Sequence, residues 1–551
     1  MLITNEQLKS LILKNGLIDE IGFSKIEEEA KNAGYTISET LVEKDIISDE
    51  NLGILISDFL KYPFIILAKI TISPDVFNII PERMARRKKV IPFAKDATGV
   101  KLAMTDPSNK ELIQMISKKI GLPATTYLAT EQDISNALKI YREDLQDTFD
   151  QLIKSSEIPM SKIVDLLINY ASQDKASDVH IEPQEKDSLV RFRIDGILHD
   201  VLSLPKSLHD QIITRIKILS RLRTDEHLSP QDGKMRVALE DEEIDIRVSI
   251  LPVTEGEKAV LRLLSSKFRK FSLVDLGMNE KDLKKVTTAY GKSYGMILST
   301  GPTGSGKTTS IYAIVKLLNT REKNITTIED PAEYRIKGVN QINVNTKTNL
   351  TFANGLRSIL RQDPNIIFVG EIRDSETAGI AVNASLTGHL VLSTLHTNDA
   401  ATALPRLIDM NVEPFLVAST VNVIIAQRLV RKICEICRST RTITKEDLLR
   451  NLPSEIINNY IGEKTTITIY QGNGCKICNA TGYLGRIGVF EVLEVTKNIR
   501  DLITKRNDAD VILQKAIEEG MTTMLDDGLE KVLKGLTTIE EVLRVAKIQN
   551  K

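Results

Sequence analysis

The chain has few aromatic side chains and no tryptophan: Phe, Tyr and Trp together make up 5% of its 551 residues. Proteins that bind single-stranded nucleic acid stack bases on aromatic side chains, so this scarcity argues against such a platform. Neither sign of charge is in excess, because 73 Lys and Arg stand against 74 Asp and Glu, a net charge of -1. We therefore expect no direct binding of nucleic acid and no overall attraction to anionic lipid.

Long apolar runs are also missing, since no stretch of about 18 uncharged apolar residues is present to cross a membrane. The first residues, Met1 to Glu6, do not lead from a basic region into an apolar core, as a secretory signal would. The four cysteines all lie between 434 and 478, too few and too clustered for a secreted disulfide scaffold. These absences predict a cytosolic protein, and its length predicts about three or four domains.

The most informative stretch runs from Gly301 to Thr308 and fits the pattern G-x-x-x-x-G-K-[ST] at every fixed position. A strand-like apolar run, 296–298, precedes it, and helical apolar spacing over 309–318 follows. Its glycines let backbone N–H groups point at a polyphosphate, and the helix N-terminus adds a positive dipole. We expect Lys307 to reach the β- and γ-phosphates and Thr308 to ligate Mg²⁺. The residues expected to bind nucleotide here are Gly301, Pro302, Thr303, Gly304, Ser305, Gly306, Lys307, Thr308 and Thr309.

The part of the chain around this loop, residues 271–551, alternates strand and helix patterns, which predicts a parallel sheet with helices on both sides. Its strand-like pieces are 296–299, 325–328, 366–369 and 390–394. The motifs follow these pieces directly. Ligands of open α/β sheets bind at the carboxyl ends of the strands, so we expect the motifs to meet there.

The preceding residues form other domains. Residues 1–145 combine helical periodicity with short β-like runs after residue 90, and 146–157 are rich in charge and predict a linker. In residues 158–270 the dipeptide Asp195-Gly196 separates two alternating runs, a strong hairpin signal. This domain is predicted to be an antiparallel sheet with helices on one face.

Two acidic segments offer the carboxylates that hydrolysis of a nucleoside triphosphate needs. The apolar run 366–369 leads into Gly370-Glu371-Ile372-Arg373-Asp374, as a Walker B strand does, although Glu371 replaces the usual Asp. Its longer side chain predicts contact with a metal-bound water rather than with the metal. Residues 328–333 add three further carboxylates, one of which can serve as the base. The alternative for each is a helix cap or a solvated loop.

Two histidines, His389 and His396, flank the apolar run 390–395, one at each end of a predicted strand. An isolated histidine is more often a hydrogen-bonded structural residue than a catalytic one. The residues alone leave these two alternatives open.

The cysteines form two C-x-x-C pairs, Cys434 with Cys437 and Cys475 with Cys478, separated by the 37 residues from 438 to 474. Four thiolates in two tight pairs suit tetrahedral Zn²⁺ in a structural site. A redox dithiol and idle buried cysteines are the alternatives. The gap exceeds that of the commonest zinc ribbon, so we expect residues 439–472 to fold as an insertion.

Together these motifs resemble those of the type II secretion and type IV pilus assembly ATPases. The resemblance covers about residues 158 to 551, and its order and spacing are highly specific. Residues 1–145 are similar to the N-terminal domain of that family, with Ile80-Pro81, Arg86-Arg87 and Asp106-Pro107. The motifs that carry it are 301–308, 328–333, 370–374, 387–397, the cysteine pairs and 481–486.

The resemblance implies an α/β fold: a RecA-like phosphate-loop ATPase domain at 271–551 and a PAS-like α+β domain at 158–270. Within the ATPase domain it implies a tetracysteine zinc subdomain at 431–490 and C-terminal helices at 495–551. The N-terminal secretion-ATPase domain, helical and α+β, is small and occupies 1–145.

The resemblance also implies roles for residues, in a homohexameric ring that binds ATP and Mg²⁺ between its second and third domains. Glu333 activates water, Glu371 supports Mg²⁺ through water, and both histidines sense the γ-phosphate. Arg247 and Arg262 close on the phosphates, and Arg357 and Arg361 match a further basic pair. The catalytic set implied in this way is Glu333, Glu371, Lys307, Arg247, Arg262, His389 and His396.

As a function, the resemblance implies a motor that powers assembly of a type IV pilus or a type II secretion pseudopilus. Its implied partners are an inner-membrane platform protein and an anchoring protein, which hold it at the inner face of the cytoplasmic membrane. The alternatives are a non-hydrolysing nucleotide-binding scaffold and a pilus-retraction or DNA-uptake motor. Two segments depart from the family pattern. Residues 224–229 lack a basic patch, and residues 36–42 lack the Arg and Gly of cyclic di-GMP motifs, so we expect no cyclic di-GMP binding.

Overall fold

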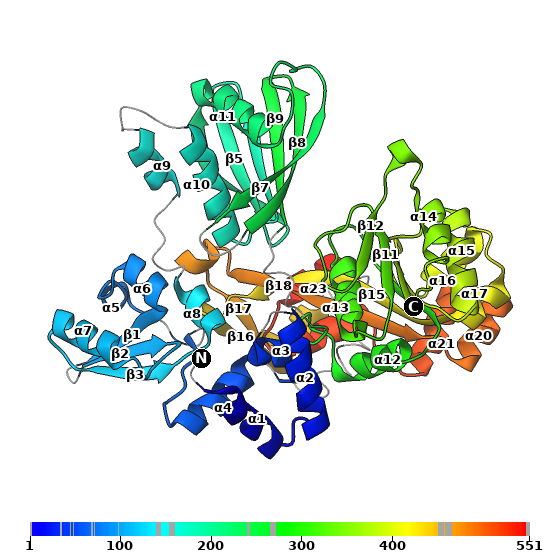
Figure 1. Ribbon diagram of the computed structural model, residues 1–551, viewed down its shortest axis with the longest axis horizontal. Coiled ribbons are helices and arrows are strands. Elements are labelled where there is room, and N and C mark those ends of the chain that lie inside the picture. The colour runs from blue at the N-terminus through cyan, green and yellow to red at the C-terminus, as the bar shows by residue number, and fades with distance from the viewer. Residues whose placement is uncertain are drawn as a thin grey trace. The chain divides into compact units, whose positions relative to one another are not determined.

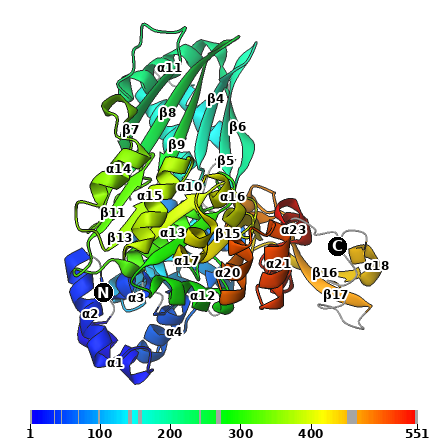
Figure 2. The ribbon, with the colours of Figure 1, turned by 90° about the vertical axis from the view of Figure 1, so that its right-hand side faces the viewer.

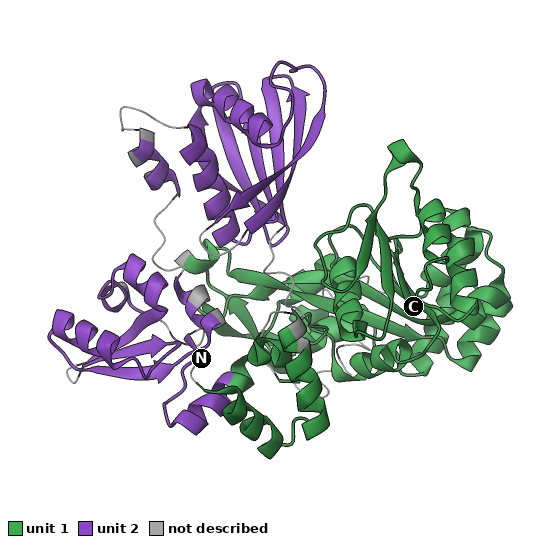
Figure 3. Ribbon diagram, in the orientation of Figure 1, with its two compact units in different colours: residues 1, 3–52, 271–551 green, residues 2, 53–270 purple. Residues whose placement is uncertain are grey.

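The computed structural model consists of two compact units, coloured green and purple in Figure 3. One contains residues 1, 3–52 and 271–551, and the other contains residues 2 and 53–270. The residues that the structure describes are 3–33, 36–43, 46–47, 49–67, 70, 72–96, 99–138, 145–153, 160–239, 243–264, 272–449, 457 and 465–546.

The larger unit contains a seven-stranded sheet in the order β12-β11-β13-β14-β10-β15-β18. The strands are β10 (Gly295–Thr300), β11 (Ile325–Glu329), β12 (Asn340–Asn343), β13 (Ile366–Val369), β14 (Leu390–Leu395), β15 (Val421–Ile433) and β18 (Tyr483–Glu494). All neighbours pair in parallel except β15 and β18. The predicted parallel sheet is confirmed, and β10, β11, β13 and β14 are its four predicted strands.

Helices cover both faces of this sheet, as Figure 1 shows for α13 and α14 on opposite sides of β11. The helices are α12 (Glu280–Tyr290), α13 (Lys307–Leu318), α14 (Phe352–Ile359), α15 (Ser375–Leu386), α16 (Ala403–Asp409) and α17 (Pro414–Thr420). Ile297 of β10 is buried with α12 and α13, whereas Met296 and Leu298 are buried with α14 to α17. Neighbouring side chains of a strand point to opposite faces of the sheet, and helices cover both faces. Both kinds of position must therefore be apolar, which explains the continuous apolar runs.

The segment between β15 and β18 contains a hairpin, and helices follow β18. The hairpin pairs β16 (Arg438–Thr444) with β17 (Thr466–Gly472), within the stretch expected to fold as an insertion. The other elements here are α18 (Lys445–Leu449), the 3₁₀ turn η5 (Lys476–Cys478), α20 (Lys497–Thr504), α21 (Ala509–Glu518), α22 (Met524–Leu533) and α23 (Ile539–Val545).

The other unit contains an antiparallel six-stranded sheet in the order β6-β5-β4-β9-β8-β7, whose strands lie side by side in Figure 2. Its strands are β4 (Asp178–Pro183), β5 (Asp187–Ile194), β6 (Ile197–Pro205), β7 (Gln231–Ala238), β8 (Glu243–Val253) and β9 (Gly256–Leu264). Helices α10 (Met160–Gln173) and α11 (Lys206–Leu219) share one core with it. The predicted turn joins β5 and β6, with φ of 51° at Asp195 and 89° at Gly196.

The N-terminal region begins with helices, followed by a three-stranded sheet, in the predicted order. The helices are α1 (Asn5–Lys14), α2 (Glu20–Ala33), α3 (Ile37–Glu43) and α4 (Asp49–Leu60). The sheet comprises β1 (Val90–Asp96), β2 (Gly99–Met104) and β3 (Ala124–Leu128), with α5 (Pro74–Phe77), α6 (Glu82–Lys88), α7 (Lys110–Ile120) and α8 (Glu131–Ala137). The fully buried residues of its core run from Leu67 to Leu138. The unit boundary near residue 52 divides the single domain expected for 1–145.

The segment 146–157, which was expected to be a linker, is mostly helical in the structure, because α9 (Leu145–Ile153) occupies most of it. Leu145 and Phe149 lie one helical turn apart and are buried in the core of the six-stranded sheet. This helix therefore belongs to the domain that follows it. Residues 154–157 lie outside the described part of the chain. Among the described residues, no helix is long and apolar enough to span a bilayer.

Candidate nucleotide site and cysteine cluster

The phosphate loop joins the carboxyl end of β10 to the first residue of α13, Lys307. Gly301 and Gly306 have φ of 143° and 90°, which side chains rarely adopt. A Cβ at Gly301 would lie 2.5 Å from the carbonyl oxygen of Gln427, and one at Gly306 would lie 2.7 Å from Nε2 of the same residue. Glycine is therefore required at both positions, because the loop lies directly against β15.

The ammonium group of Lys307 folds over this loop, and the residue is only 8% exposed. Its Nζ donates to the carbonyl oxygens of Gly301 at 2.7 Å and Pro302 at 3.0 Å. Burial lowers the pKa of Lys307 to about 8; the carboxylate of Glu371 acts in the opposite direction, and the Arg428 cation lowers it further. The lysine is thus a buried cation that a phosphate group would stabilise.

Two serines of the loop and helix differ in how their hydroxyl groups are satisfied. Ser310 of α13 donates to Oε1 of Gln427 at 2.7 Å. The buried Oγ of Ser305 has no hydrogen-bond partner among the residues that the structure describes. A buried polar atom without a partner is costly, and a loop phosphate would supply the missing acceptor. Together with the glycine cradle and the buried lysine, this fits a polyphosphate ligand.

Glu371 lies just after β13, at the same carboxyl edge of the sheet as the phosphate loop. Its side chain is 13% exposed and lies between the side chains of Arg373 and His396. Arg373 Nη2 is 2.6 Å from one carboxylate oxygen, and His396 Nε2, just after β14, is 3.3 Å from the other. Asp374 instead caps α15, because its side chain accepts the N–H of Thr377 at 2.8 Å. The Walker B segment thus supplies one carboxylate to the site.

The three carboxyl groups of the acidic segment at the end of β11 differ in how far they are buried. Glu329, the last residue of β11, is 3% exposed, and its carboxylate accepts hydrogen bonds from Tyr312 and Thr327. Asp330 and Glu333 are exposed. The Glu329 carboxylate is engaged by donors inside the protein, which leaves Asp330 and Glu333 as candidates for the base.

His389 and His396, to which the resemblance gives one shared role, lie at opposite ends of β14. His396 follows the carboxyl end of β14, whereas His389 precedes its amino end. At ~3.3 Å per strand residue the two histidines are about 23 Å apart. Nδ1 of His389 lies 3.0 Å from the carbonyl oxygen of Ala384, the structural role that the sequence left open.

The arginines of α14 and its end are engaged among helical residues. Arg357 forms an ion pair with Glu376 of α15. Arg361 donates to the carbonyl oxygen of Arg357 at 3.1 Å and to Ser358 Oγ at 3.2 Å. None of these contacts involves the phosphate loop.

Arg247 and Arg262 lie in the other unit, directly opposite each other on the adjacent strands β8 and β9. Nε of Arg262 donates to Asp178 Oδ1 on β4 at 2.9 Å. The two arginines therefore form one cationic patch on the six-stranded sheet, with Asp178 as a partner of Arg262.

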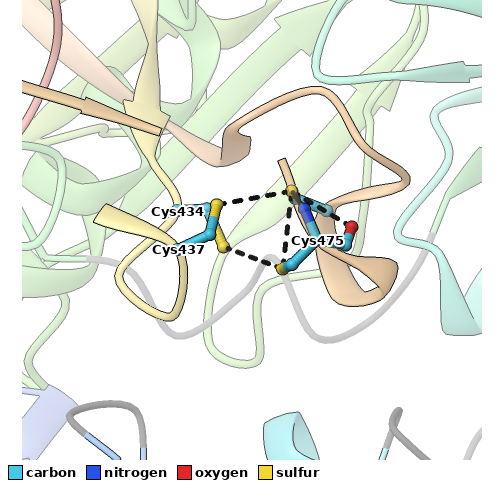
Figure 4. A group of neighbouring side chains, drawn as sticks. Cys434, Cys437 and Cys475 are labelled. Atoms are coloured by element: carbon cyan, nitrogen blue, oxygen red, sulfur yellow. Dashed lines mark hydrogen bonds between the residues drawn. The ribbon is translucent and has the colours of Figure 1, made fainter. Parts of the chain in front are cut away.

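The four cysteine sulfurs lie within 4.8 Å of one another and point toward a common centre (Figure 4). The sulfur of Cys434 is 3.9 Å from that of Cys475, and Cys437 is 3.8 Å from Cys478. Tetrahedral zinc with bonds of about 2.3 Å sets its sulfur ligands about 3.8 Å apart. Burial raises the pKa of the Cys434 thiol. The arrangement suits a four-sulfur metal site and contains no disulfide.

Comparison with known families places most of the chain. A family model described as type II/IV secretion system protein matches residues 154–544. The chain belongs to this family. A second model, the MshEN domain, matches residues 60–147. The family expected from the motifs is therefore confirmed.

Relatives of the chain match from about three quarters to nearly all of its length. It is 37% identical to the type IV pilus assembly ATPase PilB of Myxococcus xanthus, over 98% of both chains. It is 44% identical to type II secretion system protein E of Pectobacterium carotovorum, over 76% of this chain and 82% of that one. The crystal structure of the ATPase DotB of Legionella pneumophila covers 71% of this chain and 96% of its own, with a TM-score of 0.53 and 20% identity. This last likeness shows the fold alone.

Sequence reasoning gave no role to two residues of β15 beside the loop, Gln427 and Arg428. Gln427 lies behind Gly301 and Gly306, and Arg428 Nη2 donates to Asn398 Oδ1 at 3.0 Å. Burial lowers the pKa of Arg428. The mostly β-branched run 421–425 was the available signal, because a strand that begins there in parallel with β10 passes beside the phosphate loop.

Proposed function

We propose that this chain is an ATP-hydrolysing motor that works as a homohexameric ring. The supporting observation is that the phosphate loop, Glu371 and His396 meet at the carboxyl edge of one parallel sheet. In this role Lys307 would contact the β- and γ-phosphates, and Thr308 directly and Glu371 through water would hold Mg²⁺. When bound, Mg²⁺ neutralises charge that develops on the transferring phosphoryl group.

Glu333 is the residue we assign as the base for the attacking water. Burial removes Glu329 from this role, and the resemblance favours Glu333 over Asp330. His396, which lies 3.3 Å from Glu371, is positioned to contact the γ-phosphate. We leave His389 out of that contact, because it lies at the opposite edge of the sheet.

Arg247 and Arg262 supply positive charge when the six-stranded domain closes on the nucleotide as a rigid body. The adjacent positions of these residues on β8 and β9 support a shared role. We assign no phosphate contact to Arg357 and Arg361, because both are engaged among helical residues.

The work done by the ring is assembly of a type IV pilus or of a type II secretion pseudopilus. The support is likeness over 98% of both chains to a protein named as a type IV pilus assembly ATPase. The partners are a platform protein of the inner membrane and an anchoring protein, which hold a cytoplasmic ring at the membrane. The balance of charge, -1 overall, gives no reason to expect nucleic acid as a partner.

The four cysteines bind one Zn²⁺ as a structural site. All four positions are filled by sulfur at tetrahedral spacing, so no position is left open for a reacting water. Zinc would then hold the loops before β16 and before β18 together.

Cyclic di-GMP is not expected to bind, although the MshEN model matches residues 60–147. The segment 36–42 reads Thr-Ile-Ser-Glu-Thr-Leu-Val and lacks the Arg and Gly of the binding motif. Calorimetry with the full chain should detect no binding at micromolar concentrations, and a micromolar affinity would overturn this expectation.

A phosphate-release assay on the purified full chain tests the enzymatic part of the proposal. Lys307→Ala should abolish both nucleotide binding and turnover. Glu333→Gln should keep binding but lose about a hundredfold or more in kcat, the usual contribution of a general base. Full activity of Glu333→Gln would refute the assignment of the base. ATP binding by the wild type without phosphate release would favour the non-hydrolysing scaffold.

Deletion in the native cell tests the cellular part. Loss of surface pili would support pilus assembly, and loss of secreted proteins with pili intact would support the secretion system. An excess of surface pili after deletion would instead indicate a retraction motor. Copurification should recover a membrane platform protein in either of the first two cases.

A further inference from the structure

A buried polar network lies beside the acidic segment and includes one carboxylate that hydrolysis does not use. Glu329, at the end of β11, accepts hydrogen bonds from three neutral donors. These are the phenol of Tyr312, the hydroxyl of Thr327 at 2.5 Å and Nε2 of Gln341 at 3.2 Å. Burial raises the pKa of Glu329, and the three hydrogen bonds lower it. A buried carboxylate is costly, and these donors offset the cost.

The phenol of Tyr312 connects this carboxylate to the backbone of Glu333. A tyrosine hydroxyl donates one hydrogen bond and accepts two. Its proton goes to Glu329, and its oxygen accepts the N–H of Glu333 at 3.3 Å and lies 3.3 Å from Nε2 of Gln341. The hydroxyl can turn its lone pairs to the Glu333 amide because Glu329 takes its proton.

Packing fixes the tyrosine ring in place. Tyr312 is fully buried, and the rings of Tyr334 and Phe368 meet it edge-on, with centroids 4.7 and 6.0 Å away. Gln341 of β12 closes the network, because its Oε1 accepts the N–H of Ile336 at 2.7 Å. Its Nε2 also donates to the carbonyl oxygen of Tyr334 at 3.0 Å. The loop between β11 and β12 is thus bound to one rigid group.

The position of Tyr312 in the fold gives this network its consequence. Tyr312 lies on α13, the helix that begins at Lys307 of the phosphate loop. The phenol therefore joins α13 to the main chain of Glu333. The same hydrogen bond holds the backbone of Glu333 at a fixed position relative to α13.

We propose that Tyr312, supported by Glu329 and Gln341, is a positioning residue that sets the place of Glu333 relative to the bound nucleotide. It acts through the backbone of Glu333 and touches neither substrate nor metal. This inference rests on the proposed role of Glu333 as the base. In this role the network links the position of the phosphate loop to the position of Glu333, so nucleotide binding and hydrolysis are coupled within one chain.

The test measures kcat and KM for ATP in the full chain with Tyr312→Phe, which keeps the ring and removes the hydroxyl. We expect kcat to fall about tenfold with KM changed less than twofold, because the base is misplaced while the phosphate loop is intact. Tyr290→Phe is the matched control, since Tyr290 packs against the same core from α12. It should leave kcat unchanged. Gln341→Met, on the partly exposed β12, is a second variant for the case that Tyr312→Phe folds poorly.

A double-mutant cycle separates positioning from a general structural effect. In a Glu333→Gln background, Tyr312→Phe should lower the residual rate by less than twofold, because the base it positions is gone. An equal tenfold loss in both backgrounds, or an unchanged kcat in Tyr312→Phe, would overturn the inference. Full activity of Glu333→Gln alone would instead overturn the proposed base, so the two failures are distinguishable.

Discussion

The affinity for ATP should weaken above pH 8, because the ammonium group of Lys307 then loses its proton. Burial lowers the pKa of Lys307 to about 8 before nucleotide binds, and a bound polyphosphate raises it again. Below pH 8 the lysine is already charged, so binding takes up no proton and the dissociation constant stays flat. Above pH 8 binding takes up one proton, and the dissociation constant rises about tenfold per pH unit. From pH 7 to pH 9 the rise is about tenfold, or about 1.4 kcal/mol.

Calorimetric titration of the full chain with a non-hydrolysable ATP analogue and Mg²⁺ measures this dependence. A terminal phosphate loses its last proton near pH 6, about one unit below the range used. Two buffers with different heats of ionisation report the proton uptake directly, and about 0.9 proton is expected at pH 9. Lys307→Arg, which stays charged, is the control and should show no such dependence if it binds. A wild-type dissociation constant that is the same at pH 7 and pH 9 would refute the reasoning.

Three further predictions concern the cysteines, a buried carboxylate and the histidines. Metal analysis should find about one zinc per chain, and Cys434→Ser should lose it and lower the Tm; zinc retained by this variant would contradict a four-sulfur site. Burial alone would raise the pKa of Glu541, but hydrogen bonds from two arginines lower it to about 2. The ionised Glu541 therefore stabilises the folded state fully above pH 4.5, and this stabilisation is lost as the pH falls toward 2. Urea unfolding should show Glu541→Gln costing about 3 kcal/mol at pH 7 and about 1 kcal/mol at pH 3, and equal costs would contradict the shift. His396→Ala should lower kcat about tenfold and His389→Ala less than twofold, whereas equal losses in the phosphate-release assay would return both histidines to one site.

The parts of the fold that the sequence predicts are those determined by local pattern. β13 is a continuous apolar run because both its faces are covered, and the turn at Asp195-Gly196 needs residues that accept positive φ. The edge strand β12 reads Asn-Gln-Ile-Asn and has no such pattern. β4 alternates Asp178, His180 and Glu182 with its apolar residues and was also missed. Both strands form because neighbouring strands pair with them, β11 with β12 and β5 and β9 with β4, and the periodicity of the strand itself does not report this pairing.

In the candidate site, too, the sequence predicts the contiguous motifs but not the contacts that form only in the folded chain. The phosphate loop and the cysteine pairs are contiguous motifs, so their residues could be named from the sequence. The burial of Glu329 could not, because Tyr312 and Gln341 reach it only in the folded chain. The separation of the two histidines was available from the sequence, since a strand between them must set them at opposite edges of a sheet.

The most direct test of the account is a structure of the full chain with a non-hydrolysable ATP analogue and Mg²⁺. The account predicts the γ-phosphate within hydrogen-bond distance of Lys307 Nζ and a water held between that phosphate and the Glu333 carboxylate. A nucleotide bound elsewhere, or one in the loop with Glu333 pointing away from the γ-phosphate, would contradict it.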